Sequence, residues 1–129
     1  MKLLLDTCAL LWMGLDASKL SERAQDALAQ NGAELFVSAI SAFEIGLKFA
    51  RGKLELPSDP LPWFADALEA YGIVELPMTS EIAVTAACLE WEHRDPADRI
   101  VAATALRSGL VVVTSDLALR SFAAVEAVW

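Results

Sequence analysis

Four acidic residues stand at separated points of the chain where a folded sheet could bring them together. They are Asp6, Glu44, Asp98 and Asp116. Asp6 directly follows a run of leucines at residues 3–5, and Asp116 closely follows the β-branched run at 111–113. Open α/β sheets place their functional groups at the carboxyl ends of strands. We therefore expect these carboxylates to gather at one edge of a sheet.

Carboxylates gathered in this way predict a site for a divalent metal ion. Two unit charges about 4 Å apart repel by roughly 4 kcal/mol at an effective dielectric constant of 20, so a bare cluster is unfavourable. A divalent cation reverses the sign of that interaction. Oxygen ligands without a cysteine pair or a histidine cluster select Mg²⁺ or Mn²⁺ over zinc. Such ions activate water and stabilise the leaving oxygen of a phosphodiester, so the predicted chemistry is metal-assisted hydrolysis.

Each of these carboxylates also has a structural interpretation. Asp6 and Asp116 stand where each could cap the helix that follows a strand. Glu44 could be an ordinary surface residue of an apolar helix, and Asp98 could complete a capping arrangement in a helix that begins just before it. Asp95 fits the cap of that helix, so we place it beside the metal ligands and not among them. Capping does not exclude metal contact, and both interpretations stay open.

Basic residues are scarce. Ten Lys and Arg against 18 Asp and Glu give a net charge of −8, which argues against a general nucleic-acid binder. The one local basic strip is formed by Lys48, Arg51 and Lys53, and its first two residues share roughly one helical face with Glu44. The strip could lead RNA phosphates to the metal. His93 is the only histidine. Because the chain has no Gly-x-Ser-x-Gly elbow and no glycine-rich phosphate loop, we interpret it as a solvated loop residue.

Apolar runs alternate with helical patterns along the whole chain. The expected strands are residues 2–5, 35–37, 73–76, 110–113 and 125–128, and the expected helices are 21–31, 39–51, 61–71 and 117–122, with others after Thr7, Thr79 and Asp95. The pair Asp95-Pro96 is a strong helix start, since Asp is favoured at the cap and Pro at the first helical position. This order predicts an α/β fold: one domain over residues 1–129, with a parallel sheet of four to five strands and helices on both faces.

Composition sets expectations about partners and location. No run reaches the roughly 18 apolar residues of a membrane span, and Asp6 interrupts the only stretch that imitates a signal peptide, so we expect a cytoplasmic protein with no membrane partner. The apolar share of 56% is above the usual range. It predicts that some large apolar residues line a contact with a partner. The candidates are Leu11, Trp12, Phe49, Trp63, Phe64 and Trp91.

Four segments occur in a characteristic order: Leu4-Leu5-Asp6-Thr7-Cys8-Ala9-Leu10-Leu11-Trp12, then residues 38–45, 93–105 and 112–116. Together they resemble the signature of PIN-domain proteins, and most nearly that of VapC-type toxins of VapBC toxin–antitoxin modules. The resemblance implies a Rossmann-like parallel sheet, a Mg²⁺- or Mn²⁺-dependent ribonuclease, a homodimer, and inhibition by a cognate VapB-type antitoxin. By position it assigns the four acidic residues to the metal site, with Thr7 and Ser115 as neighbouring hydroxyls. Ala97 departs from the pattern, since many relatives carry an aromatic residue there.

Two alternatives accompany this interpretation. A phosphatase of the haloacid dehalogenase type also places an aspartate after its first strand, but it expects a second aspartate two residues later, where this chain has Cys8. A PIN fold without catalysis could serve as an interaction module. All four carboxylates are present, so nothing in the sequence favours that interpretation.

Overall fold

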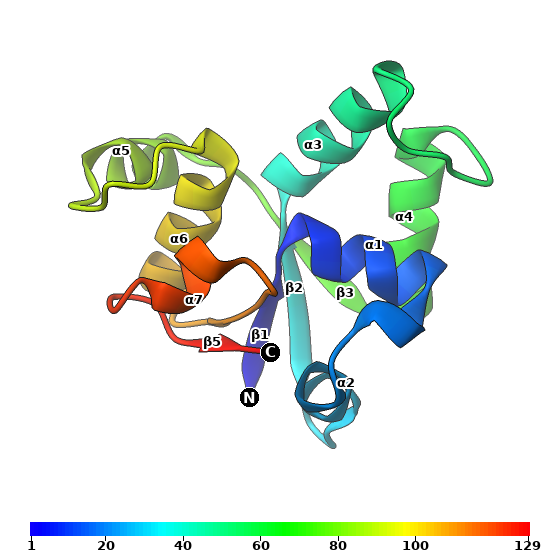
Figure 1. Cartoon of the computed structure of the whole chain (residues 1–129), viewed down its shortest axis with the longest axis horizontal. Coiled ribbons are helices and arrows are strands. Elements are labelled where there is room, and N and C mark those ends of the chain that lie inside the picture. Colours follow the sequence, from blue (N-terminus) through cyan, green and yellow to red (C-terminus); the bar gives the residue numbers. More distant parts are fainter.

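The strands form one parallel sheet in the computed structural model, which describes residues 1–129 (Figure 1). They are β1 (Lys2–Leu5), β2 (Glu34–Ser38), β3 (Ile73–Leu76), β4 (Val111–Val113) and β5 (Ala127–Val128). Their order across the sheet is β3-β2-β1-β4-β5, and every neighbouring pair is parallel. The expected parallel sheet of four to five strands is therefore confirmed.

Helices connect the strands. They are α1 (Thr7–Leu15), the short 3₁₀ helix η1 (Ala17–Lys19), α2 (Glu22–Ala29), α3 (Ala39–Ala50), α4 (Pro60–Tyr71), α5 (Ser80–Cys88), α6 (Pro96–Ser108) and α7 (Leu117–Ser121). Asp95 caps α6 as its sequence predicts. Asp6 caps α1, as one interpretation of the sequence holds, and Thr7 is the first helical residue.

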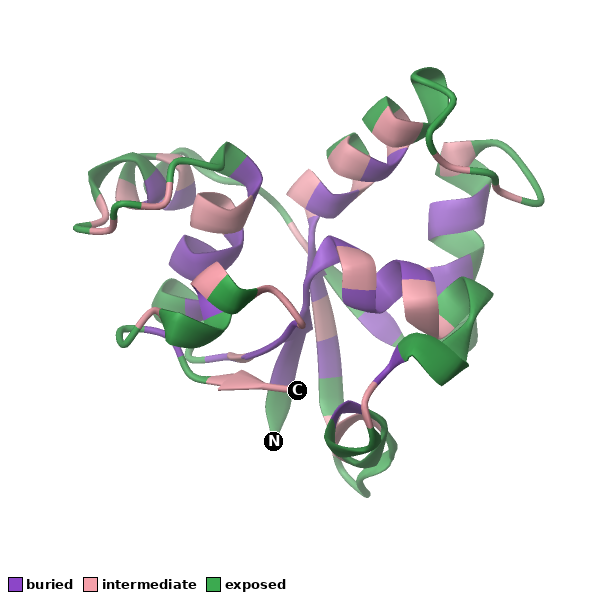
Figure 2. Cartoon of the chain, viewed as in Figure 1, coloured by how far each residue is buried: buried purple, intermediate pink, exposed green.

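Side-chain alternation along β1 divides the core between the two faces of the sheet. Leu3 and Leu5 pack with Leu10 of α1 and Phe64 of α4 in the larger core cluster, which also contains residues of α2 and α3. Leu4 points the other way and packs against α6 and α7. The buried sides of the helices accordingly face the sheet (Figure 2). Helices on both faces, as predicted, are confirmed.

The register of the sheet aligns three strand ends. Leu5 pairs with Val37 on one side and with Val113 on the other. Asp6 therefore emerges next to the end of β4, and its N–H donates to the Val113 carbonyl at 3.1 Å. The residues that follow β1, β2 and β4 share one edge of the sheet, which is the edge where the sequence predicts the acidic site.

The apolar excess is accounted for differently than expected. Leu11, Trp63 and Phe64 are core residues and not interface candidates. Trp63 is buried because α4 packs closely on α1 at Gly14, where an added Cβ would lie 2.8 Å from the indole Cζ2 atom. Other large apolar side chains are exposed instead, with Phe43 on α3 at 63%. No helix combines the length and the apolar character needed to cross a bilayer.

Candidate metal centre

Asp6 is buried at the end of β1, where its carboxylate accepts two hydrogen bonds. One comes from the Ala9 N–H at 2.8 Å and caps α1, and the other comes from the Thr114 hydroxyl. Burial is the main cause that raises the pKa of Asp6 to about 6; the two hydrogen bonds oppose the rise, and the neighbouring Asp98 and Asp116 carboxylates add to it. The fold thus holds Asp6 where its ionised form is poorly solvated and lies within range of two like charges.

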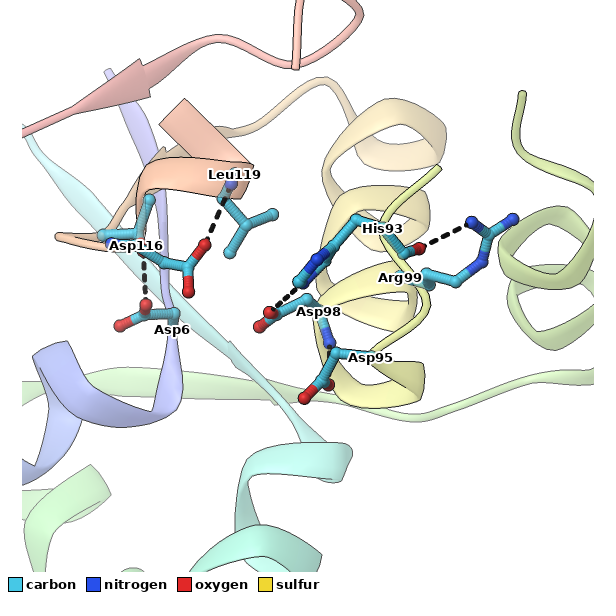
Figure 3. A network of polar contacts seen from close by, with 8 residues as sticks. Asp6, His93, Asp95, Asp98, Arg99, Asp116 and Leu119 are labelled. Atoms are coloured by element: carbon cyan, nitrogen blue, oxygen red, sulfur yellow. Dashed lines mark hydrogen bonds and ion pairs between the residues drawn. The ribbon is translucent and has the colours of Figure 1, made fainter. Parts of the chain in front are cut away.

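Asp98 and Asp116 reach the same place from two helices (Figure 3). Asp98 lies in the first turn of α6, and Asp116 caps α7 by accepting the Leu119 N–H at 3.1 Å. Single ligand atoms of His93, Asp98 and Asp116 all lie within 4.8 Å of one another. Burial also raises the pKa of Asp98, with smaller upward contributions from Asp95 and Asp116. Three of the four predicted carboxylates therefore influence one another at this edge.

His93 is not the solvated loop residue that the sequence suggested. Its side chain is 29% exposed, and its Nε2 atom lies 2.7 Å from Oδ2 of Asp98. The available signal was spacing, since His93 precedes Asp98 by five residues across the start of a helix capped by Asp95. The chain changes direction where Asp95 caps α6, so the loop residue His93 lies beside the first helical turn, which carries Asp98. His93 must therefore be counted among the residues of the site.

Glu44 lies on α3 and meets the site through Thr7. The Thr7 hydroxyl donates a hydrogen bond to Glu44 and lies 2.9 Å from the Ser41 hydroxyl. Glu44 is not part of the compact group formed by His93 and the two helix-borne aspartates. Thr7 directly follows Asp6, so Glu44 borders the cluster on the α3 side. Its role as a metal ligand stays a prediction.

The hydroxyl that supports Asp6 belongs to Thr114, which sequence reasoning missed. Thr114 is fully buried; it donates to Asp6 Oδ2 and accepts the Asp116 N–H at 3.0 Å. Ser115, which the resemblance places as a neighbouring hydroxyl of the metal site, is only partly buried and its hydroxyl makes no hydrogen bond within the protein. Strand register contained the signal, because pairing Leu5 with Val113 places the next residues, Asp6 and Thr114, side by side.

Thr114→Val tests this support. Valine keeps the shape but leaves the Asp116 N–H without its acceptor, which should cost about 1–3 kcal/mol of unfolding free energy. The substitution should also raise the pKa of Asp6 further, because the hydrogen bond from Thr114 lowers that pKa in the wild type. Loss of an outer partner typically weakens metal affinity by about 10–100-fold, and calorimetric titration with Mn²⁺ should show a fall of that size. Ser115→Ala is the matched control and should leave the unfolding free energy, the pKa of Asp6 and the Mn²⁺ affinity unchanged.

Asp95 and the basic strip occupy the surroundings of the site. Asp95 accepts the Asp98 N–H at 3.1 Å and so fixes the turn that carries Asp98. Lys48, Arg51 and Lys53 line one surface pocket, together with Glu44 and Leu47. The structure thus brings the predicted RNA-binding residues next to the predicted ligand on α3. Contact of Lys48 and Arg51 with RNA stays a prediction.

The donor set fits a hard divalent cation. Carboxylate oxygens dominate it, as Mg²⁺ and Mn²⁺ prefer, and Mn²⁺ also accepts imidazole nitrogen. Only two ion pairs occur in the chain, His93–Asp98 and Arg107–Glu81. No lysine or arginine therefore pairs with Asp6, Asp98 or Asp116. A bound cation would supply the counter-charge that no lysine or arginine provides.

Comparisons with known proteins agree with this architecture. Solved structures with the same fold include VapBC2 from Rickettsia felis bound to a DNA fragment from its promoter, with a TM-score of 0.71, 12% identity, and 98% of this chain and 97% of that chain covered. FitAcB from Neisseria gonorrhoeae has a TM-score of 0.61 and 27% identity, with coverage of 97% and 95%.

Sequence comparison identifies the family. The PIN domain model matches residues 3–125. Ribonuclease VapC22 from Mycobacterium tuberculosis is 34% identical over 119 residues, which cover 92% of this chain and 89% of that protein. Because both matches span nearly the whole chain, this protein belongs to the PIN-domain family, among its VapC-type members.

Proposed function

We propose that this protein is a Mg²⁺- or Mn²⁺-dependent ribonuclease that acts as the toxin of a type II toxin–antitoxin system. The observation that carries the proposal is the convergence of Asp6, Asp98 and Asp116 at one sheet edge without an arginine or lysine to neutralise them. The name of the relative VapC22 supports ribonuclease activity. The haloacid dehalogenase alternative is set aside because the family match is to the PIN domain.

The residues of the site have separable tasks. Asp98 and Asp116 would hold the ion, with Asp6 beside them and Glu44 completing the ligand set from α3. A divalent ion bound there supplies a Lewis acid that activates water and neutralises charge developing on a phosphodiester. Thr114 fixes Asp6 and the backbone of Asp116, so the carboxylates keep their places when metal is absent. This arrangement needs no side chain as the general base.

The basic pocket on α3 supplies the proposed path for RNA. Lys48→Ala and Arg51→Ala are each expected to weaken RNA binding. Each should also lower the slope of log affinity against log salt concentration, by about 0.7 for every phosphate of single-stranded RNA that is no longer neutralised. Affinity for Mn²⁺ should not fall, because neither residue is a ligand. Filter binding at several salt concentrations measures the slope, and an unchanged slope in both variants would place the RNA elsewhere.

An antitoxin of the VapB type and a second copy of the chain are the proposed protein partners. Solved structures of the same fold include the VapBC-1 pair of Haemophilus influenzae, with a TM-score of 0.65, 16% identity, and coverage of 98% and 96%. On this chain, Ala39, Ile40, Phe43 and Met78 form a wholly apolar surface pocket beside the start of α3. An apolar antitoxin helix could lie there and direct a basic side chain toward the carboxylates. Light scattering that shows a monomer at micromolar concentration, alone and with the antitoxin, would refute both partners.

The test of the activity is cleavage of total RNA by purified protein. Cleavage should require Mn²⁺ or Mg²⁺, stop with excess chelator and resume when the ion is restored. Mn²⁺ should also raise the melting temperature of the wild-type protein, because a ligand that binds only the folded state stabilises it. A melting temperature indifferent to Mn²⁺ together with intact RNA would favour a PIN fold that acts only as an interaction module.

A further inference from the structure

The loop between α5 and α6 delivers the only histidine of the chain to the acidic cluster. His93 Nε2 lies 2.7 Å from Asp98 Oδ2, which is hydrogen-bonding distance. When Asp98 is ionised, as it must be to bind a metal ion, its carboxylate only accepts hydrogen bonds and Nε2 carries the proton of this contact. The contact therefore orients Asp98 and leaves its other oxygen available.

Hydrogen bonds from the Arg99 side chain to backbone carbonyls hold the loop that carries His93. The Arg99 guanidinium donates to the carbonyls of Trp91 and His93 at 2.8 and 2.9 Å, and to that of Leu89 at 2.8 Å. Its remaining donors reach the end of α5. Three hydrogen bonds to the loop and two to the end of α5 thus tie both segments to α6, the helix that also carries Asp98. Figure 3 shows the bond between Arg99 and the His93 carbonyl.

Aromatic packing also holds the same loop. The Trp91 ring stacks on Phe122 with centroids 4.3 Å apart and planes 5° apart. The ring centroids of His93 and Trp91 lie 4.9 Å apart. His93 is therefore confined between a tryptophan and a carboxylate, and its contact with Asp98 is built into the fold.

We propose that His93 is a positioning residue for metal binding: its Nε2–H orients Asp98 so that the free carboxylate oxygen binds the ion, and the imidazole itself is not a ligand. The inference rests on the proposed function, since it assumes that a divalent ion occupies the cluster. Ligating carboxylates are commonly held by such outer hydrogen bonds. Mg²⁺ and Mn²⁺ prefer oxygen ligands, and Nε2 already forms a hydrogen bond with Asp98. Orientation of Asp98 by His93 therefore accounts for the geometry better than direct coordination of the ion by the imidazole.

Two substitutions separate these roles. His93→Ala removes the donor and should weaken Mn²⁺ binding by about 10–100-fold in calorimetric titration, as for other outer partners of metal ligands. His93→Gln places an amide N–H near the position of Nε2 and should recover most of the affinity. Glu92→Gln, at an exposed neighbouring position, is the matched control. Wild-type affinity in His93→Ala, or His93→Gln as weak as His93→Ala, would overturn the proposal.

Spectroscopy of the wild-type protein gives an answer that does not depend on folding of the variants. Because His93 is the only histidine, protein purified with a histidine-free tag gives an unambiguous imidazole signal. Long-range ¹H–¹⁵N NMR of the metal-free protein should show a proton on Nε2, and electron spin echo spectroscopy of bound Mn²⁺ should show no coordinated imidazole nitrogen. An unprotonated Nε2, or a coordinated nitrogen, would contradict positioning.

Failure of the inference can be told from failure of the proposed function. If calorimetry shows that the wild-type protein binds Mn²⁺ no better than Asp116→Asn, the proposed metal site is refuted, and the inference about His93 is refuted with it. Wild-type protein that binds Mn²⁺ tightly while His93→Ala binds equally well would leave the metal site standing and reject only the role of His93.

Discussion

Asp98→Asn and Asp116→Asn should each reduce Mn²⁺ affinity and RNA cleavage by more than about 100-fold, because loss of an outer partner alone costs about 10–100-fold and a ligand contributes more. The fold should survive both changes. Asn keeps the shape of Asp, and at position 116 its oxygen can still accept the Leu119 N–H and cap α7. Calorimetric titration with Mn²⁺ and cleavage of a labelled RNA measure the two effects.

Asp26→Asn is the matched control for these variants. Asp26 is an exposed residue of α2 outside the cluster, so its loss should leave metal affinity and cleavage unchanged. Glu44→Gln measured in the same assays decides whether the carboxylate on α3 is a ligand or only a neighbour of Thr7. Full cleavage with wild-type Mn²⁺ affinity in Asp116→Asn would refute the metal centre as described.

Asp6→Asn should stabilise the metal-free protein by as much as about 3 kcal/mol at pH 7. The pKa of Asp6 rises from 3.8 to about 6 in the fold, and each pKa unit corresponds to about 1.36 kcal/mol. Asn removes the charge but keeps the contacts, since its oxygen can accept the Ala9 N–H and its amide can donate to Thr114. The wild-type protein in turn should gain more stability from Mn²⁺ than the variant does.

Because the fold raises the pKa of Asp6, the stability gained by Asp6→Asn should depend on pH. Between about pH 4 and pH 6 the folded state binds more protons at Asp6 than the unfolded state, so its contribution to the unfolding free energy falls as pH rises through that window. The advantage of Asp6→Asn should therefore be absent near pH 4 and complete above pH 6. Urea denaturation of both proteins without metal at several pH values measures the difference. A difference that does not change with pH would show that Asp6 is not held in a destabilised ionised form.

Much of the fold follows from local sequence signals. The β-branched run before Thr114 predicts a buried strand, and Asp95-Pro96 predicts the start of α6 to the residue. Parallel strands must end at a common edge, which is why Asp6 and Asp116 could be expected near each other from the sequence. Asp98 joins them in the sequence prediction without such a constraint, because it lies in the first turn of a helix and a helix start can face several directions.

Other features depend on contacts that local patterns do not encode. Spacing places His93 just before the start of α6, but its contact with Asp98 also depends on the Arg99 guanidinium, which binds the backbone carbonyls of the loop. No local pattern shows that Arg99 will bind there. The sequence alone makes Trp63 a candidate for a partner contact, whereas its indole lies against Gly14 of α1 and is buried. Glu44 meets the site through Thr7, which depends on the packing of α3 against α1.

The chemistry of the RNA ends tests the central claim most directly. If the carboxylate cluster binds a divalent ion and water attacks the phosphodiester with O3′ as the leaving group, the products carry 5′-phosphate and 3′-hydroxyl groups, and none should form in excess chelator. Mass spectrometry of a short cleaved RNA, with Mn²⁺ and with chelator, identifies the ends. Products with 2′,3′-cyclic phosphate that form without divalent ions would contradict the account, even for a protein that cleaves RNA.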